Sequence, residues 1–154
     1  MRLTDILTVQ RVKVPLVQTQ KEAVIAEMVD LLAANGDLAD RDKVLQAVLE
    51  REHTRTTGIG GGLALPHGKS SGVGDLLMAV GRPAAPIAFD SNDGKPVNFV
   101  VLLVGPPEKV EAHIQALSRV SRLLILDAVR NKLLAAKTAQ ELYDTIVAQE
   151  KALG

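Results

Sequence analysis

The segment from Gly58 to Lys69 holds a histidine in a setting that could support phosphoryl chemistry. His67 stands between Pro66 and Gly68, directly after a short apolar run. Proline fixes its own φ and biases the preceding residue towards an extended conformation, while Gly68 leaves room beside the ring and a free N–H. A neutral imidazole nitrogen is a good nucleophile, and an ordinary pKa of about 6.5 keeps histidine mostly neutral at neutral pH. His67 is therefore a candidate phosphate acceptor, and the alternative is a turn histidine with no role.

Four of the five residues from Gly58 to Gly62 are glycine. Glycine loses more backbone entropy on folding than any other residue, so this stretch predicts an irregular loop with a purpose. A common purpose is close approach of the backbone to a ligand, above all an anion held by successive N–H groups. Two nucleotide motifs are excluded by counting. A Walker A loop would need glycine where Leu63 stands, and a dinucleotide fingerprint would need Gly or Ala at Leu63 or Leu65.

Arg51 and His113 could assist a phosphate on His67. Taken alone, an arginine near a helix end is usually a solvated charge, and His113 continues an apolar helix face formed by Leu117, Val120 and Leu124. A phosphorylated imidazole, however, carries about two negative charges that need donors. An arginine, a second imidazole and backbone N–H groups could supply them. Phosphoryl transfer demands positioning and charge stabilisation, so this set needs no metal site.

Local patterns predict the elements that must position these residues. Residues 12–17 indicate a strand with one apolar face, made of Val12, Val14 and Leu16. Pro15 places this strand at a sheet edge or at its own end. A capping box that starts at Thr19 opens a first helix, which Gly36 ends, and Asp40 caps a second helix over residues 41–52.

The second half of the chain predicts strands and then helices. The strands are expected at residues 63–65, 76–80 and 97–104. Residues 99–104 are apolar at every position, which indicates a central strand covered on both faces. Helices are expected to begin at Pro106–Pro107, near Asp127 and at the capping box of Thr138. Helices before and after a block of strands indicate one α/β domain spanning residues 1–154.

Composition excludes several classes of protein. The 154 residues carry 18 basic and 18 acidic side chains for a formal net charge of +0, and aromatic residues make up 2%. Neither a broad basic surface nor an aromatic stacking platform is available, so nucleic acid is not an expected partner. The chain has no cysteine and only 3 His. We therefore expect no disulfide, no metal and no other cofactor.

The sequence also predicts a cytoplasmic protein without direct membrane insertion. The N-terminus lacks the apolar stretch of a signal peptide, and the longest apolar runs, such as residues 99–104, are far shorter than a membrane span.

Two stretches of the chain carry a family likeness. Thr57–Gly60 and Ala64–Gly68 closely resemble the phosphorylation-site signature of the mannitol/fructose-type IIA components of the bacterial sugar phosphotransferase system (PTS). That group includes the stand-alone nitrogen-regulatory IIA proteins. Arg51 lies 16 residues before His67, where the family has an active-site arginine. His113 lies 46 residues after His67, in a segment similar to the one that carries the second active-site histidine. The likeness covers nearly the whole chain.

This resemblance implies a three-layer α/β/α sandwich around a mixed β-sheet and a phosphotransferase component with a phosphohistidine intermediate. His67 would accept phosphate from the histidine phosphocarrier protein, while Arg51, His113 and Gly68 would bind and stabilise the phosphoryl group. The phosphate would then pass to a IIB component or signal to regulatory target proteins. The chain has no additional IIB or IIC domain, which favours the regulatory version.

A second hypothesis is a non-catalytic binding module on the same scaffold. Retention of Arg51, His67 and His113 together argues against it. A third hypothesis, a phosphate-binding enzyme with its own small substrate, lacks a further acid/base pair near the glycine-rich segment.

Overall fold

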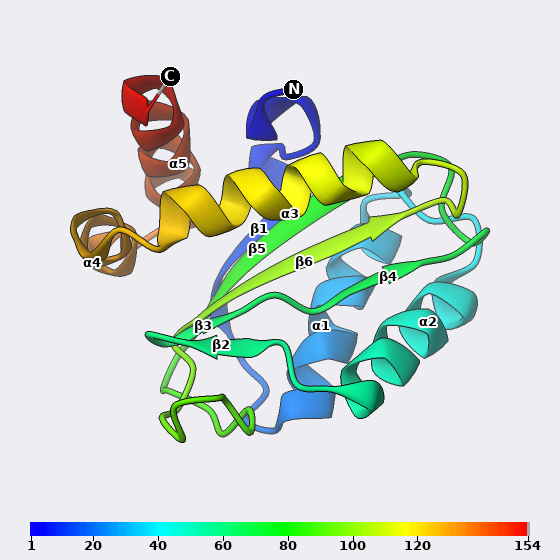
Figure 1. Cartoon of the computed structure of the whole chain (residues 1–154), viewed down its shortest axis with the longest axis horizontal. Coiled ribbons are helices and arrows are strands. Elements are labelled where there is room, and N and C mark those ends of the chain that lie inside the picture. Colours follow the sequence, from blue (N-terminus) through cyan, green and yellow to red (C-terminus); the bar gives the residue numbers. More distant parts are fainter. Residues whose placement is uncertain (154) are drawn as a thin grey trace.

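A six-stranded mixed sheet lies between two layers of helices in the computed structural model, which describes residues 1–153 (Figure 1). The strands are β1 (Val12–Leu16), β2 (Gly58–Gly60), β3 (Leu63–Ala64), β4 (His67–Lys69), β5 (Leu77–Pro83) and β6 (Phe99–Gly105). Their order is β1-β5-β6-β3-β2, and β4 also pairs with β6. The β5–β6 and β2–β3 pairs are antiparallel, whereas β1, β3 and β4 pair in parallel with their neighbours β5 and β6. The predicted α/β class and mixed sheet are confirmed.

Helices α1 (Lys21–Ala34) and α2 (Arg41–Thr54) cover one face of the sheet (Figure 1). Helices α3 (Val110–Leu124), α4 (Asp127–Ala135) and α5 (Ala139–Leu153) pack with the opposite face. Short 3-10 turns at Leu3–Asp5 and Val9–Arg11 precede β1. Each face therefore has its own apolar core, and β6 is buried at every position between them, as its uninterrupted apolar sequence predicts. Within residues 1–153, none of the helices has the length and hydropathy needed to cross a bilayer.

Most helix boundaries follow their local signals. The Asp40 side chain accepts from the Lys43 N–H at 3.1 Å, and the Thr138 hydroxyl accepts from the Glu141 N–H at 3.1 Å. Gly36 ends α1 with a φ of 79°. The capping box at Thr19 is wrong, because α1 begins after Gln20 and has no side-chain cap. Helix α3 starts at Val110, since residues 106–109 form a turn before the helix.

Strand β1 lies at the sheet edge, as Pro15 predicts, but its apolar residues do not share one face. Val12 packs into the core under α3 and α5, with Val14 partly buried against it. Leu16 packs into the opposite core, under α1 and α2. The register with β5 shifts between Lys13 and Leu16, and this irregularity turns the end of the strand to the other layer.

The glycine-rich segment is not an irregular loop, so that prediction is wrong. Strands β2 and β3 form an antiparallel hairpin whose turn is Gly61 and Gly62, and Gly60, Gly61 and Gly62 have positive φ values of 98°, 66° and 81°. A Cβ added at Gly58 would lie 2.4 Å from the Ser91 hydroxyl, and one at Gly62 would lie 2.4 Å from the Asn98 side-chain oxygen. The glycines thus allow a tight turn and a close approach of neighbouring protein, and an approach of the backbone to an anion stays a prediction.

Candidate functional site

His67 begins β4, a strand that pairs in parallel with β6 through the register His67↔Leu103. Its side chain is half-buried, and its Nδ1 lies 2.8 Å from the carbonyl oxygen of Leu65. A carbonyl can only accept a hydrogen bond, so Nδ1 carries the ring proton. The lone pair of the neutral ring is therefore on Nε2. The sequence left open which of the two ring nitrogens is unprotonated.

His113 lies in the first turns of α3, and its ring centroid is 5.7 Å from that of His67 with the two planes at 60°. Its side chain is only 3% exposed. Neither ring nitrogen of His113 has a hydrogen-bond partner among residues 1–153. The neutral ring carries one N–H, which therefore lies close to the His67 ring without a protein partner among these residues. The structure thus brings together the two histidines that stand 46 positions apart in the sequence.

Both imidazoles are held in the neutral form. Burial is the largest cause that lowers the pKa of each ring, and it lowers the pKa of His113 to about 4. The hydrogen bond to Leu65 opposes burial at His67, whereas the positive charges of Arg51 and Lys69 add to it and lower the pKa of His67 further. A neutral His67 keeps the Nε2 lone pair that nucleophilic attack requires.

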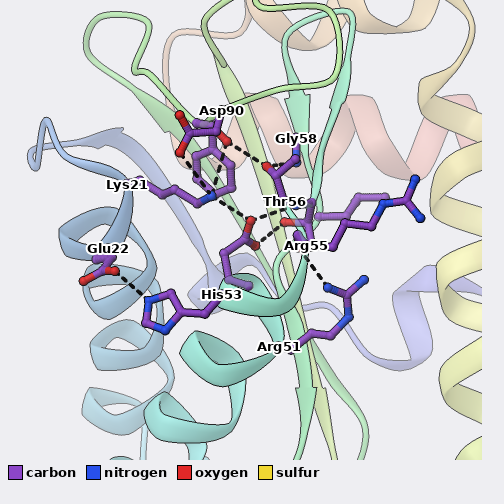
Figure 2. A network of polar contacts seen from close by, with 12 residues as sticks. Lys21, Glu22, Arg51, His53, Arg55, Thr56, Gly58 and Asp90 are labelled. Carbon is purple, nitrogen blue, oxygen red and sulfur yellow. Dashed lines mark hydrogen bonds and ion pairs between the residues drawn. The ribbon is translucent and has the colours of Figure 1, made fainter.

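Arg51 lies in the last turn of α2, and its Nη1 donates to the carbonyl oxygen of Arg55 at 2.9 Å (Figure 2). Its positive charge lowers the pKa of His67, so the guanidinium lies within electrostatic reach of the His67 ring. One of its five N–H donors is occupied by Arg55, so others remain for an anion. His53, the third histidine, lies apart from the site on the surface, where its Nε2 is 2.7 Å from a carboxylate oxygen of Glu22 (Figure 2).

Gly68 is buried inside the β4–β6 pair, where it faces α2. A Cβ at this position would lie 3.1 Å from the backbone of Ala47 and Val48. This close approach of helix and strand accounts for glycine next to His67. A role of its N–H in binding phosphate stays a prediction.

Lys69 is a site residue that the sequence reasoning missed. It lies two positions after His67 on β4, and alternate residues of a strand share a face. Its positive charge lowers the pKa of both His67 and His113. The two-residue spacing in the sequence was the signal that could have identified it. Glu52, which is buried beside Arg51, was also missed.

Comparisons with known proteins identify the family and the fold of the chain. The family model of the phosphoenolpyruvate-dependent sugar phosphotransferase system, EIIA 2, matches residues 5–149. The chain is 37% identical over 149 residues to the fructose-specific EIIA component of Haloferax volcanii, with 95% of this chain and 97% of that protein covered. It is 33% identical over 146 residues to the nitrogen regulatory protein of Pseudomonas aeruginosa, with 95% of each covered. Against the fructose-specific EIIABC component of Bacillus subtilis it is 36% identical, and it spans 24% of that longer protein.

Solved structures show the same fold. The nitrogen regulatory protein IIA-Ntr of Neisseria meningitidis superimposes with a TM-score of 0.84 at 27% identity, covering 92% of this chain and 97% of that one. IIA mannitol from Escherichia coli superimposes with a TM-score of 0.75 at 19% identity, covering 91% and 98%. The match of the family model over nearly the whole chain decides the classification. The chain belongs to the EIIA 2 family of the phosphoenolpyruvate-dependent sugar phosphotransferase system.

Proposed function

We propose that this protein carries a phosphoryl group on Nε2 of His67 and receives it from the histidine phosphocarrier protein. One observation carries the proposal, the arrangement of His67 and His113. The neutral His67 ring has its proton on Nδ1, and its centroid lies 5.7 Å from that of the buried His113 ring, whose N–H has no protein partner among residues 1–153. The first ring is prepared as a nucleophile, and the second is prepared to donate to the group that the first would hold.

The transfer exchanges one N–P bond for another. The Nε2 lone pair of His67 attacks the phosphorus of the donor's phosphohistidine, and the electron pair of the breaking N–P bond returns to the donor's ring nitrogen. The His67 ring gains positive charge as the new bond forms. The Leu65 carbonyl, 2.8 Å from Nδ1, stabilises that charge. The N–H of His113 and the free N–H groups of Arg51 would bind the phosphoryl oxygens.

The phosphate then has two possible destinations, a IIB component or a regulatory target protein. Similarity to a fructose-specific EIIA component and to nitrogen regulatory proteins supports both. In either version we propose that residues 1–154 form a single IIA domain that works in the cytoplasm.

The direct test is intact-protein mass spectrometry after incubation with phosphoenolpyruvate, enzyme I and the histidine phosphocarrier protein. We expect one acid-labile phosphate on the wild type and none on His67→Ala. The matched control is His53→Ala, which removes a surface histidine outside the site and keeps the label. A folded wild type that takes no phosphate from a cognate donor would contradict the carrier function and favour a non-catalytic binding module.

A further inference from the structure

A buried carboxylate lies one residue after Arg51, at the end of α2. Glu52 is 3% exposed and accepts two hydrogen bonds from Thr57, one from its N–H at 2.7 Å and one from its hydroxyl. Lys21 of α1, which is labelled in Figure 2, completes the cluster, with its Nζ 2.9 Å from a Glu52 oxygen. Lys21 is itself held by the Phe89 carbonyl oxygen at 3.3 Å and by the face of the Phe89 ring. A charge is buried at low cost only when it is paired and hydrogen-bonded in this way.

The contacts of Thr57 lead from this carboxylate to His67. The Thr57 carbonyl oxygen accepts from the Leu65 N–H at 3.0 Å. The Leu65 carbonyl oxygen in turn accepts from Nδ1 of His67 at 2.8 Å. Glu52 therefore fixes the residue that aligns Leu65, and Leu65 supplies the group that fixes the His67 proton.

Leu65 is buried in the core, and β3 and β4 on either side of it pair with β6, whereas on the β2 side its N–H bonds to Thr57. The hairpin register consists of Gly58↔Ala64 and Gly60↔Leu63 with an irregularity between them, and Pro66, which follows Leu65, has no N–H to donate. Two of the four residues in that register are glycines, which restrain the backbone least. The anchor between Glu52 and Thr57 compensates by tying the hairpin to α2, the same helix that carries Arg51.

We propose that Glu52 is a positioning residue that acts through Thr57 and Leu65 to keep the His67 proton on Nδ1. It thereby keeps the Nε2 lone pair available and fixes the position of the His67 ring relative to Arg51. This inference rests on the proposed function of His67, because a fixed Nε2 lone pair matters here for its nucleophilic attack on phosphorus. Glu52 touches neither ring, but its negative charge also raises the pKa of His67, so Thr57→Val, which keeps that charge, is the variant that isolates the effect on alignment.

The first test measures the His67 tautomer in the unphosphorylated protein by nitrogen-15 NMR at neutral pH. Glu52→Gln removes the charge, and Thr57→Val removes the hydroxyl while preserving the shape of the side chain. Both variants are expected to move part of the His67 population from the Nδ1–H to the Nε2–H form. Thr57→Ser, which keeps the hydroxyl, is expected to retain the wild-type tautomer.

The matched control is Glu27→Gln on α1. Glu27 is also a buried carboxylate, 8% exposed, which accepts from the Val17 and Gln18 N–H groups at 2.9 Å and pairs with Lys13 at 2.8 Å. Its partners belong to β1 and the segment after it, at the opposite edge of the sheet from the β2–β3 hairpin. Glu27→Gln should destabilise the fold as Glu52→Gln does, yet leave the His67 tautomer unchanged.

The second test measures phosphate labelling as a function of donor concentration. We expect the rate at saturating donor to fall about tenfold in Glu52→Gln, the lower end of the range found when a partner that orients a metal-binding histidine is lost. The half-saturating donor concentration is expected to stay constant. An unchanged tautomer in both Glu52→Gln and Thr57→Val would overturn the proposal, as would an equal change in Glu27→Gln. The tautomer is read without phosphate, so a failure of the carrier function would appear separately, as an unlabelled wild type.

Discussion

The two imidazoles of the site show opposite designs. His67, at the start of β4, is half-buried, and its Nδ1 is bonded to Leu65. His113, in the first turns of α3, is almost fully buried, and neither of its nitrogens has a partner within residues 1–153. A strand end supplies backbone carbonyls that can fix a ring, whereas the carbonyls of a helix interior are occupied by the helix itself.

Under the proposed function, this difference would divide the work between the two rings. A nucleophile gains from a hydrogen bond that fixes its tautomer, so satisfying Nδ1 of His67 prepares Nε2 for attack. A ring that donates to a transferred phosphoryl group gains from having no other partner, because no existing hydrogen bond of its N–H must then break first. The unmatched donor of His113 lowers the stability of the fold and is held in place by the apolar packing of α3.

The largest expected effect of this contrast is on the pH dependence of the free energy of unfolding. The pKa of His113 is about 4 in the folded state and about 6.5 when unfolded, so between these values the unfolded chain binds the extra proton. The stability from the neutral ring is complete above pH ~6.5 and is lost as the pH falls towards 4, by about 3 kcal/mol. When urea unfolding is measured across this pH range, the free energy of unfolding of His113→Leu should fall by about 3 kcal/mol less than that of the wild type. Parallel curves for the two proteins would contradict the burial of a neutral His113.

A substitution of His113 should separate stability from transfer. His113→Leu removes both unpartnered nitrogens and keeps an apolar side chain in the core, so at neutral pH the free energy of unfolding should rise by about 1 kcal/mol. The same variant should slow labelling of His67 about 100-fold, the cost of losing one donor in such a site. Stopped-flow labelling with denaturant unfolding measures both. His113→Gln, which retains an N–H donor, should recover part of the rate. Faster unfolding together with unchanged transfer in His113→Leu would assign His113 to the core alone.

The contrast between local and tertiary signals also explains what the sequence could predict. Asp40, Thr138 and the apolar run of β6 act through residues within one element, and the structure confirms each of them. The hairpin of β2 and β3 was missed because two of its glycines are required by the close approach of Ser91 and Asn98, which are distant in the sequence. The sequence did not predict the side of the sheet to which Leu16 points, because the register shift between β1 and β5 determines it.

The site follows the same division. His67 could be selected from its neighbours in the sequence, and the spacing of Arg51 and His113 followed from a family resemblance. Glu52 has no such local signal. An acidic residue near a helix end usually faces solvent, and only the approach of Lys21 and Thr57 shows that this one is buried.

Arg51 combines both designs and gives the smallest expected effect. One N–H of Arg51 donates to the Arg55 carbonyl oxygen and fixes the side chain, and the remaining N–H groups can bind an anion. Lysine keeps the charge but is a single point donor on a flexible stem, so it cannot hold the carbonyl and also present a planar pair of donors. Arg51→Lys should therefore slow labelling of His67 about tenfold, equivalent to about 1.4 kcal/mol of transition-state stabilisation. The matched control is Arg55→Lys, which changes a neighbouring side chain and leaves the backbone carbonyl in place. Equal slowing in both variants would show that the rate depends on the overall positive charge of this region, and that the geometry of Arg51 has no part in it.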